Sequence, residues 1–155
     1  MEVKATRVFD ATVEQVWQAW TESRYVHQWW GPDGFTAPVA EMEVHEGGRS
    51  RVSMRSPDGA ELYNTWTYER VIPLQRLEFI MGFADVDWQP RTPAELGLPP
   101  DIPARVRHVV TFTSTGQKTE LTVTELGYTS PQTVEISKLG LEQCLDKMAI
   151  ALSVA

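Results

Sequence analysis

His108 is the strongest candidate for a functional residue, because it lies in a segment where every second residue is apolar. In the segment 104–114 it shares its phase with Val106, Val110 and Phe112. Alternate residues of a β-strand point to the same face, so the imidazole is expected on an apolar face. A neutral imidazole in such a place needs a hydrogen-bond partner.

Two roles for His108 follow from this position. The first is a core histidine whose partner is Asn64, Tyr68 or Tyr63. The second is a histidine that orients a ligand or transfers a proton, because small-molecule sites place a few polar groups in an apolar pocket. The sequence leaves both roles open.

Other motifs for catalysis or metal binding are absent from the sequence. There is no G-x-S-x-G elbow, no H-E-x-x-H motif and no glycine-rich phosphate loop. His27, His45, His108 and Cys144 lack the spacing of metal ligands. We therefore expect no metal site and no cofactor.

Composition narrows the possible partners. The chain has 155 residues, a net charge of −7 and 42% hydrophobic residues, and this acidity argues against nucleic acid or anionic membrane as a partner. It has one cysteine, no signal-peptide pattern at MEVKATRVFD and no apolar run of about 18 residues. These features predict one domain over residues 1–155, a cytoplasmic location and no membrane insertion.

Two adjacent tryptophans precede a strong turn in the stretch HQWWGPDGF, residues 27–35. Neighbouring residues point in different directions, so one flat surface cannot bury both rings. We expect one ring in the core and the other at the border of an entrance. The turn Gly31-Pro32-Asp33-Gly34 then returns the chain to the sheet.

Helical periodicity appears near both ends of the chain. The first helical region starts at Thr12, where Gln15 completes a capping-box spacing, and extends to about Trp29 with a break near Ser23-Arg24. The second begins with Ser130-Pro131 and runs to about Ser153, long enough to cross a whole sheet.

Strand patterns occupy most of the remaining sequence. Their expected ranges are 3–10, 36–45, 49–56, 60–72, 75–83, 104–114 and 118–127. The short loops between them favour antiparallel hairpins. The segment 84–103 contains five prolines, so we expect no strand pairing there but a long loop, with Trp88, that covers the same entrance.

Alternation assigns one face of this sheet to the interior. The inward set on the strands is Val52, Met54, Leu62, Asn64, Trp66, Tyr68, Leu77, Phe79, Met81, Phe83, Val106, His108, Val110, Phe112, Leu121 and Val123. Arg49, Arg51 and Arg55 fall on the outer face. The order of elements predicts an α+β fold in which a curved sheet holds one long helix and can leave a cavity.

The chain resembles the activator-of-Hsp90-ATPase-like members of the START-related (SRPBCC) superfamily. The resemblance rests on ATVEQVWQAWTESRYVHQWWGPDGF, EGGRSRVSMRSPDG, YERVIPLQRLEF and LGLEQCLDKMAIAL. In the last motif Leu141 replaces a tryptophan common in the family. The resemblance implies the helix-grip fold: a seven-stranded antiparallel sheet around the C-terminal helix, with two short helices between the first two strands. Relatives bind lipids, steroids, polyketides or plant hormones, and a few are cyclases or hydrolases.

Three functions are consistent with these observations. The leading one is binding of a small hydrophobic molecule in an apolar cavity between the sheet and the C-terminal helix. The alternatives are a cavity enzyme of the cyclase or hydrolase type that uses His108, and a co-chaperone-like interaction module that uses the outer face. A homodimer is also possible, through the first strand or the strand at 36–45.

The expected ligand-binding residues come from the inward face, the second tryptophan and the long helix. They are Trp30, Met54, Asn64, Trp66, Tyr68, Phe79, Met81, Phe83, His108, Val110, Phe112, Leu141, Cys144 and Met148.

Overall fold

The computed structural model describes residues 1–154 and contains eight strands, three α-helices and one short 3-10 helix in that part of the chain. In chain order these are β1 (Glu2–Phe9), α1 (Val13–Thr21), α2 (Ser23–Trp29), β2 (Ala40–Glu41), β3 (Arg49–Arg55), β4 (Glu61–Ile72), β5 (Arg76–Ala84), β6 (Pro90–Arg91), η1 (Ala94–Leu96), β7 (Arg105–Ser114), β8 (Thr119–Leu126) and α3 (Pro131–Ser153).

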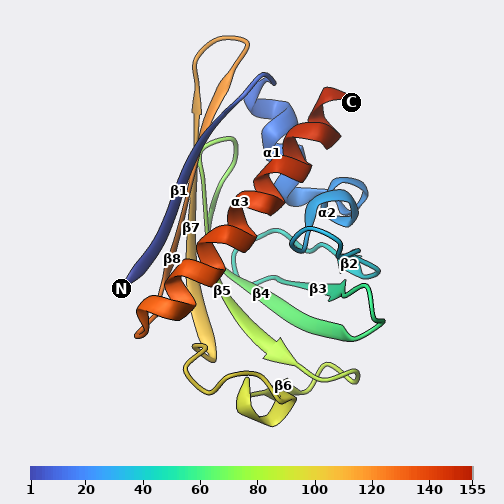
Figure 1. Cartoon of the computed structure of the whole chain (residues 1–155). Helices are drawn as coiled ribbons and strands as arrows, with labels where there is room; N and C mark the ends of the chain where they lie inside the picture. Colours follow the sequence, from blue (N-terminus) through green and yellow to red (C-terminus); the bar gives the residue numbers. More distant parts are fainter. Residues whose placement is uncertain (155) are drawn as a thin grey trace.

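All strand pairs are antiparallel, and the sheet has the order β1-β8-β7-β5-β4-β3-β2, with β6 added beside β5. Figure 1 shows that the sheet twists strongly and that α3 crosses one of its faces diagonally, with α1 and α2 beside the C-terminal part of α3. The predicted α+β helix-grip architecture, with two short helices between the first strands, is confirmed. No helix within residues 1–154 is long and apolar enough to span a membrane.

Two strand predictions need correction. The expected strand at 36–45 is reduced to Ala40–Glu41, with a separate bridge between Thr36 and Arg55. The loop at 84–103 was expected to make no strand pairing, but Pro90 and Arg91 pair with Ala84 and Phe83. A proline is tolerated at such an outer edge, where no further strand needs its missing N–H.

Local signals explain where the helices begin and end. The side chain of Thr12 accepts from the backbone N–H of Gln15, and the Gln15 side chain accepts from the backbone N–H of Thr12, which is a complete capping box. Helix α2 follows after a one-residue break at Glu22. Helix α3 begins at Pro131 after Ser130, although the Ser130 side chain makes no capping bond to the helix backbone.

The core contains a cluster of tryptophans between the short helices and the sheet. Trp29 is 1% exposed, and its ring lies 4.7 Å from that of Trp20 and 6.2 Å from that of Trp66. Its indole N–H donates to the carbonyl of Ala19 at 2.6 Å. Trp29 is therefore the core member of the adjacent pair, as expected.

The turn after the tryptophans is tied to α3. Gly31 and Gly34 have φ of +104° and +83°, a backbone region that favours glycine. The ammonium of Lys147 donates to the carbonyl of Gly31 at 2.9 Å and to that of Phe35 at 3.2 Å. These contacts hold Trp30 in place between α2 and the middle of α3.

Candidate functional site

A large cavity lies between the sheet and the first turns of α3. Its volume is about 600 Å³. Apolar side chains form most of its wall, and the last part of the loop at 84–103 closes one side. The lining residues are Trp30, Met54, Leu62, Asn64, Met81, Phe83, Leu98, Pro99, Asp101, Ile102, Val106, Tyr128, Gln132, Thr133, Ile136 and Ser137.

A smaller cavity of about 160 Å³ lies deeper, against the middle of α3. It shares Trp30, Met54, Met81, Tyr128 and Ser137 with the larger one, so the two spaces adjoin. Its other lining residues are Trp20, Trp29, Pro32, Trp66, Phe79, His108, Glu125, Gly140, Leu141 and Cys144.

The position of both cavities follows from the side chains along α3. In its second half, Leu145 and Met148 are fully buried and pack into the core. In its first half, small or polar residues such as Thr133, Ser137 and Gly140 face the same side. A Cβ atom at Gly140 would have no heavy atom within 4 Å. The second half of the helix therefore packs into the core, and space is left beside its start.

A buried polar cluster borders the smaller cavity. Glu125 lies opposite His108 in the pairing of β7 with β8, and both are buried. One Glu125 carboxylate oxygen lies 3.3 Å from His108 Nε2, and the other accepts from the hydroxyl of Tyr128 at 3.0 Å. His108 Nδ1 lies 3.2 Å from the carbonyl of Val106. Each ring nitrogen of His108 thus lies close to a protein oxygen.

The partner of His108 differs from every residue that the sequence suggested. The amide nitrogen of Asn64 donates to the carbonyl of Gly82 at 3.1 Å, and the Tyr68 hydroxyl bonds with Ser50 at 2.8 Å. Tyr63 packs against Trp88. Glu125 supplies the contact instead, because it continues the inward phase of Leu121 and Val123 on β8.

Four buried polar atoms have no hydrogen-bond partner within the described part of the chain. They are the indole nitrogens of Trp20, Trp30 and Trp66 and the side-chain oxygen of Asn64. All four residues line one of the two cavities. A buried polar group without a partner costs about 1–3 kcal/mol, and a bound molecule with suitable oxygen or N–H groups can remove this cost.

Cys144 and Tyr128 are shifted toward their neutral forms. Burial raises the pKa of the Cys144 thiol to about 12, and this outweighs the opposing effects of the Gly31 backbone and Lys147. Burial also raises the pKa of Tyr128, and the nearby Glu125 acts in the same direction. A neutral thiol and a neutral phenol suit an apolar pocket better than a nucleophilic centre.

The structure divides the expected ligand-binding residues into two groups. Ten line one or both cavities: Trp30, Met54, Asn64, Trp66, Phe79, Met81, Phe83, His108, Leu141 and Cys144. The other four, Tyr68, Val110, Phe112 and Met148, line neither cavity and are buried in the packed core. These four are therefore not cavity-lining residues: the ring of Phe112, for example, packs against that of Trp17 on α1, with centroids 5.1 Å apart.

The predicted position of the long loop over the cavity entrance is right for only part of the loop. Residues Leu98, Pro99 and Ile102 line the large cavity, as a covering loop should. Trp88 does not cover that entrance: its ring lies 5.3 Å from the ring of Tyr63, and it lines a hollow on the outer face. Trp30, in contrast, borders both inner cavities as expected. No group of three or more His, Cys, Asp or Glu residues suited to a metal ion occurs within residues 1–154.

Comparison with known proteins identifies a family and a fold. The family model described as "Activator of Hsp90 ATPase homolog 1-like protein" matches residues 10–153. A Mycobacterium smegmatis protein is 25% identical with a TM-score of 0.76, covering 99% of this chain and 88% of that one. An Arthrobacter aurescens protein is 23% identical with a TM-score of 0.81, covering 99% and 87%. No curated protein gives a significant sequence match.

A Silicibacter pomeroyi protein named AHSA1 is also similar in structure. It is 18% identical, with a TM-score of 0.80, and the match covers 99% of each chain. At this level of identity the likeness concerns the fold alone, so the function has to be argued from the cavities themselves.

Proposed function

Because the chain belongs to the activator of Hsp90 ATPase homolog 1-like family, we propose that it binds a small, mainly hydrophobic molecule in the cavity beside the start of α3. Helix-grip proteins bind hydrophobic ligands or act in the manner of co-chaperones. The choice between these functions rests on the cavity, the loop that closes it and the chemistry of its wall.

The observation that carries the proposal is the size and lining of the large cavity. Its volume of about 600 Å³ falls in the range of about 300–1,000 Å³ that is typical of small-molecule sites. Burial of about 200 Å² of apolar ligand surface contributes about 5 kcal/mol before the costs of binding. An apolar ligand of modest size therefore needs no special chemistry to bind.

The lining also indicates where the polar end of a ligand would lie. Trp30, whose indole N–H has no partner, borders both cavities, and the unpaired oxygen of Asn64 belongs to the larger one. Leu98, Ile102 and Ile136 supply apolar parts of the wall. We propose an apolar body with one hydrogen-bonding group, held with that group toward Trp30 and Asn64.

Titration with N-phenyl-1-naphthylamine, an uncharged apolar probe that fluoresces more strongly in dry surroundings, tests the proposal. We expect saturable binding of one probe per chain. Native mass spectrometry of freshly purified protein provides a second readout, in which a co-purified molecule would appear as a mass above that of the chain. Absence of saturable probe binding would contradict the proposal.

A pair of variants on β7 separates the cavity from the rest of the surface. Val106 is 1% exposed and lines the large cavity, so Val106→Phe should occupy part of it and weaken probe binding by at least about tenfold. Val109 lies on the same strand but on the outer face, so Val109→Phe should leave probe binding unchanged. Equal effects of the two variants would refute an interior site.

The alternatives have weaker support. An acid–base role for His108 requires a ring nitrogen that can reach a substrate, but each nitrogen lies within 3.3 Å of a protein oxygen. A co-chaperone-like role requires a surface for a partner protein, and the exposed arginines Arg49, Arg51 and Arg55 of the outer face would have to provide it. A cytoplasmic location and a homodimer through an edge strand remain predictions.

A further inference from the structure

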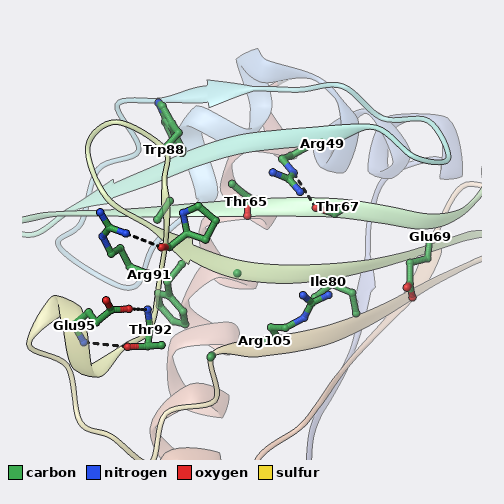
Figure 2. A pocket seen from close by; sticks show the side chains of 15 residues that line it. Arg49, Thr65, Thr67, Glu69, Ile80, Trp88, Arg91, Thr92, Glu95 and Arg105 are labelled. Atoms are coloured by element: carbon green, nitrogen blue, oxygen red, sulfur yellow. Dashed lines mark hydrogen bonds between the residues drawn. The ribbon is translucent and has the colours of Figure 1, made fainter.

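A second hollow lies on the outer face of the sheet, on the opposite side from α3. It has a volume of about 360 Å³ and lies between strands β3 to β7 and the first part of the long loop, as Figure 2 shows. We call it the outer groove. Its lining residues are Arg49, Thr65, Thr67, Glu69, Ile80, Gly82, Phe83, Ala84, Trp88, Pro90, Arg91, Thr92, Glu95, Ala104 and Arg105.

The register of the sheet places arginines on both sides of this groove. One row of paired neighbours across the sheet runs Arg49, Thr67, Ile80 and Arg107, and the next runs Arg51, Thr65, Gly82 and Arg105. Each row therefore has an arginine on β3, an arginine on β7 and uncharged residues between them. With strands about 4.8 Å apart, the two sides are about 14 Å apart, within reach of arginines that lean inward.

Three of these arginines have no carboxylate partner within the described chain. Arg107 pairs with Glu69 and Glu78, but Arg49, Arg51 and Arg105 form no ion pair. Arg49 donates from Nε to the hydroxyl of Thr67 at 3.1 Å, which directs its guanidinium over β4 (Figure 2). The lining of the groove carries three arginines (Arg49, Arg91 and Arg105) and two glutamates (Glu69 and Glu95), and Glu41 and Glu43 line another hollow that also includes Arg49.

The two acidic residues that line the groove, Glu69 and Glu95, already have partners. The Glu69 carboxylate pairs with Arg107, and the Glu95 carboxylate accepts from the backbone N–H of Thr92 at 2.8 Å. Arg91 pairs with Asp85 at 2.9 Å. The guanidinium groups of Arg49 and Arg105 are therefore available to bind an anion.

Trp88 and Gly82 give the groove a wall and a floor. Trp88 has a φ of +63°, which side-chain-bearing residues rarely adopt, and the guanidinium of Arg51 lies 5.3 Å from its ring centroid. Gly82 is an interior residue of β5, where a glycine often marks close approach of a ligand. A Cβ at Gly82 would meet only the Thr65 hydroxyl, at 3.4 Å, so the fold does not require glycine there.

We propose that the outer groove binds a small organic anion with a flat or apolar body and a phosphate or carboxylate group. The volume fits a small molecule, the tryptophan and Ile80 can contact the body, and Arg49 and Arg105 can bind the charged group through their planar donors. A nucleic acid or an anionic membrane would present many negative charges to an acidic protein and is disfavoured. This site lies on the other face of the sheet from the inner cavity, and Phe83 is the one residue that lines both.

NMR titration of ¹⁵N-labelled protein tests the proposal directly. The probes are phenyl phosphate and benzoate, which distinguish a phosphate from a carboxylate site, and benzyl alcohol is the uncharged control. We expect saturable shifts of the backbone amides of Thr65, Thr67 and Gly82 and of the Trp88 indole N–H with at least one anion. Benzyl alcohol should cause no such shifts.

Arginine variants show whether the charge is specific to the groove. Arg49→Gln and Arg105→Gln should each weaken anion binding by about tenfold or more, because each removes charged hydrogen bonds to the anion. Arg55→Gln is the matched control, since Arg55 lies on the same strand and face but pairs with Glu61 outside the groove. Gly82→Val should also abolish binding by filling the floor, while circular dichroism remains unchanged.

Several results would overturn the proposal. These are the absence of saturable shifts with both anions, shifts confined to inner-cavity residues such as Val106, and equal shifts with benzyl alcohol. Equal loss of binding in Arg55→Gln would indicate general charge attraction. Binding of a hexa-aspartate peptide at the groove without binding of either small anion would replace the small molecule with an acidic protein segment.

Discussion

Replacement of Gly140 by alanine should stabilise the protein, because this glycine lies inside α3 beside the smaller cavity. Alanine is favoured over glycine in a helix interior by about 0.5–1 kcal/mol. The structure adds no steric penalty, since a Cβ at this position would meet no heavy atom within 4 Å. For a chain of this size, the gain corresponds to a rise in Tm of about 2–4 °C per kcal/mol.

Urea denaturation followed by circular dichroism measures this change. We expect a higher midpoint with an unchanged slope, because the variant alters stability and not the surface exposed on unfolding. Gly140→Phe provides a second measurement: its ring needs more room than the methyl group, so it should reduce binding of N-phenyl-1-naphthylamine. If Gly140→Ala instead lowered the midpoint, the space beside the middle of α3 would be filled, and the description of the smaller cavity would be wrong.

Three further predictions concern reactivity, packing and pH. Burial raises the pKa of Cys144 from 9.0 to about 12, so its thiolate fraction at pH 8 should be about a thousandfold lower than for an ordinary thiol. Ellman's reagent should therefore react far faster with the protein unfolded in urea than with the native protein. Phe112→Ala should destabilise the fold by about 3–5 kcal/mol in urea denaturation without changing probe affinity in the folded protein, because Phe112 is buried but lines neither cavity; a weakened affinity would move the site toward Phe112. The Ser53 hydroxyl and, less strongly, Arg55 lower the pKa of Glu61. The ionised Glu61 therefore stabilises the folded protein above its unfolded pKa, and this stabilisation is lost as the pH falls through the folded pKa. Glu61→Gln should lower the free energy of unfolding by about 1 kcal/mol at pH 7 and by less below about pH 4.5, and a loss that does not change with pH would refute this linkage.

Alternation along the strands was sufficient to identify the inward face. Asn64, Trp66 and Tyr68 on β4 are buried, and the arginines of β3 are exposed, because one face of this sheet packs against helices and the other meets solvent. Capping and turn signals also placed the helices to within one or two residues. These features depend on neighbours in sequence, which explains why the sequence alone could define them.

The partner of His108 could have been found by the same reasoning taken further. Glu125 has the same parity as Leu121 and Val123 in the last strand, and the short hairpin between β7 and β8 brings it opposite His108. The predicted partners were amide and hydroxyl groups on β4; a carboxylate is an uncommon partner in a core, because charged residues are rarely buried.

The extent of the cavity could not be predicted in this way. It depends on how far each end of α3 lies from the sheet, which Lys147 and the turn at Gly31 help to fix through contacts far apart in sequence. Phe112 and Met148 have the same inward phase as the lining residues but are buried in the packed core, where Phe112 contacts Trp17 of α1. Trp88 was misplaced for a related reason, since a loop without periodicity does not reveal which face of the sheet it meets.

The most direct test of the central claim is to locate a bound apolar molecule inside the protein. Intermolecular nuclear Overhauser effects between N-phenyl-1-naphthylamine and protein methyl groups provide that location. We predict contacts with the methyl groups of Leu98, Val106 and Ile136, which surround the large cavity. Contacts only with methyl groups of the outer face, such as those of Ile80 and Val109, would contradict the account.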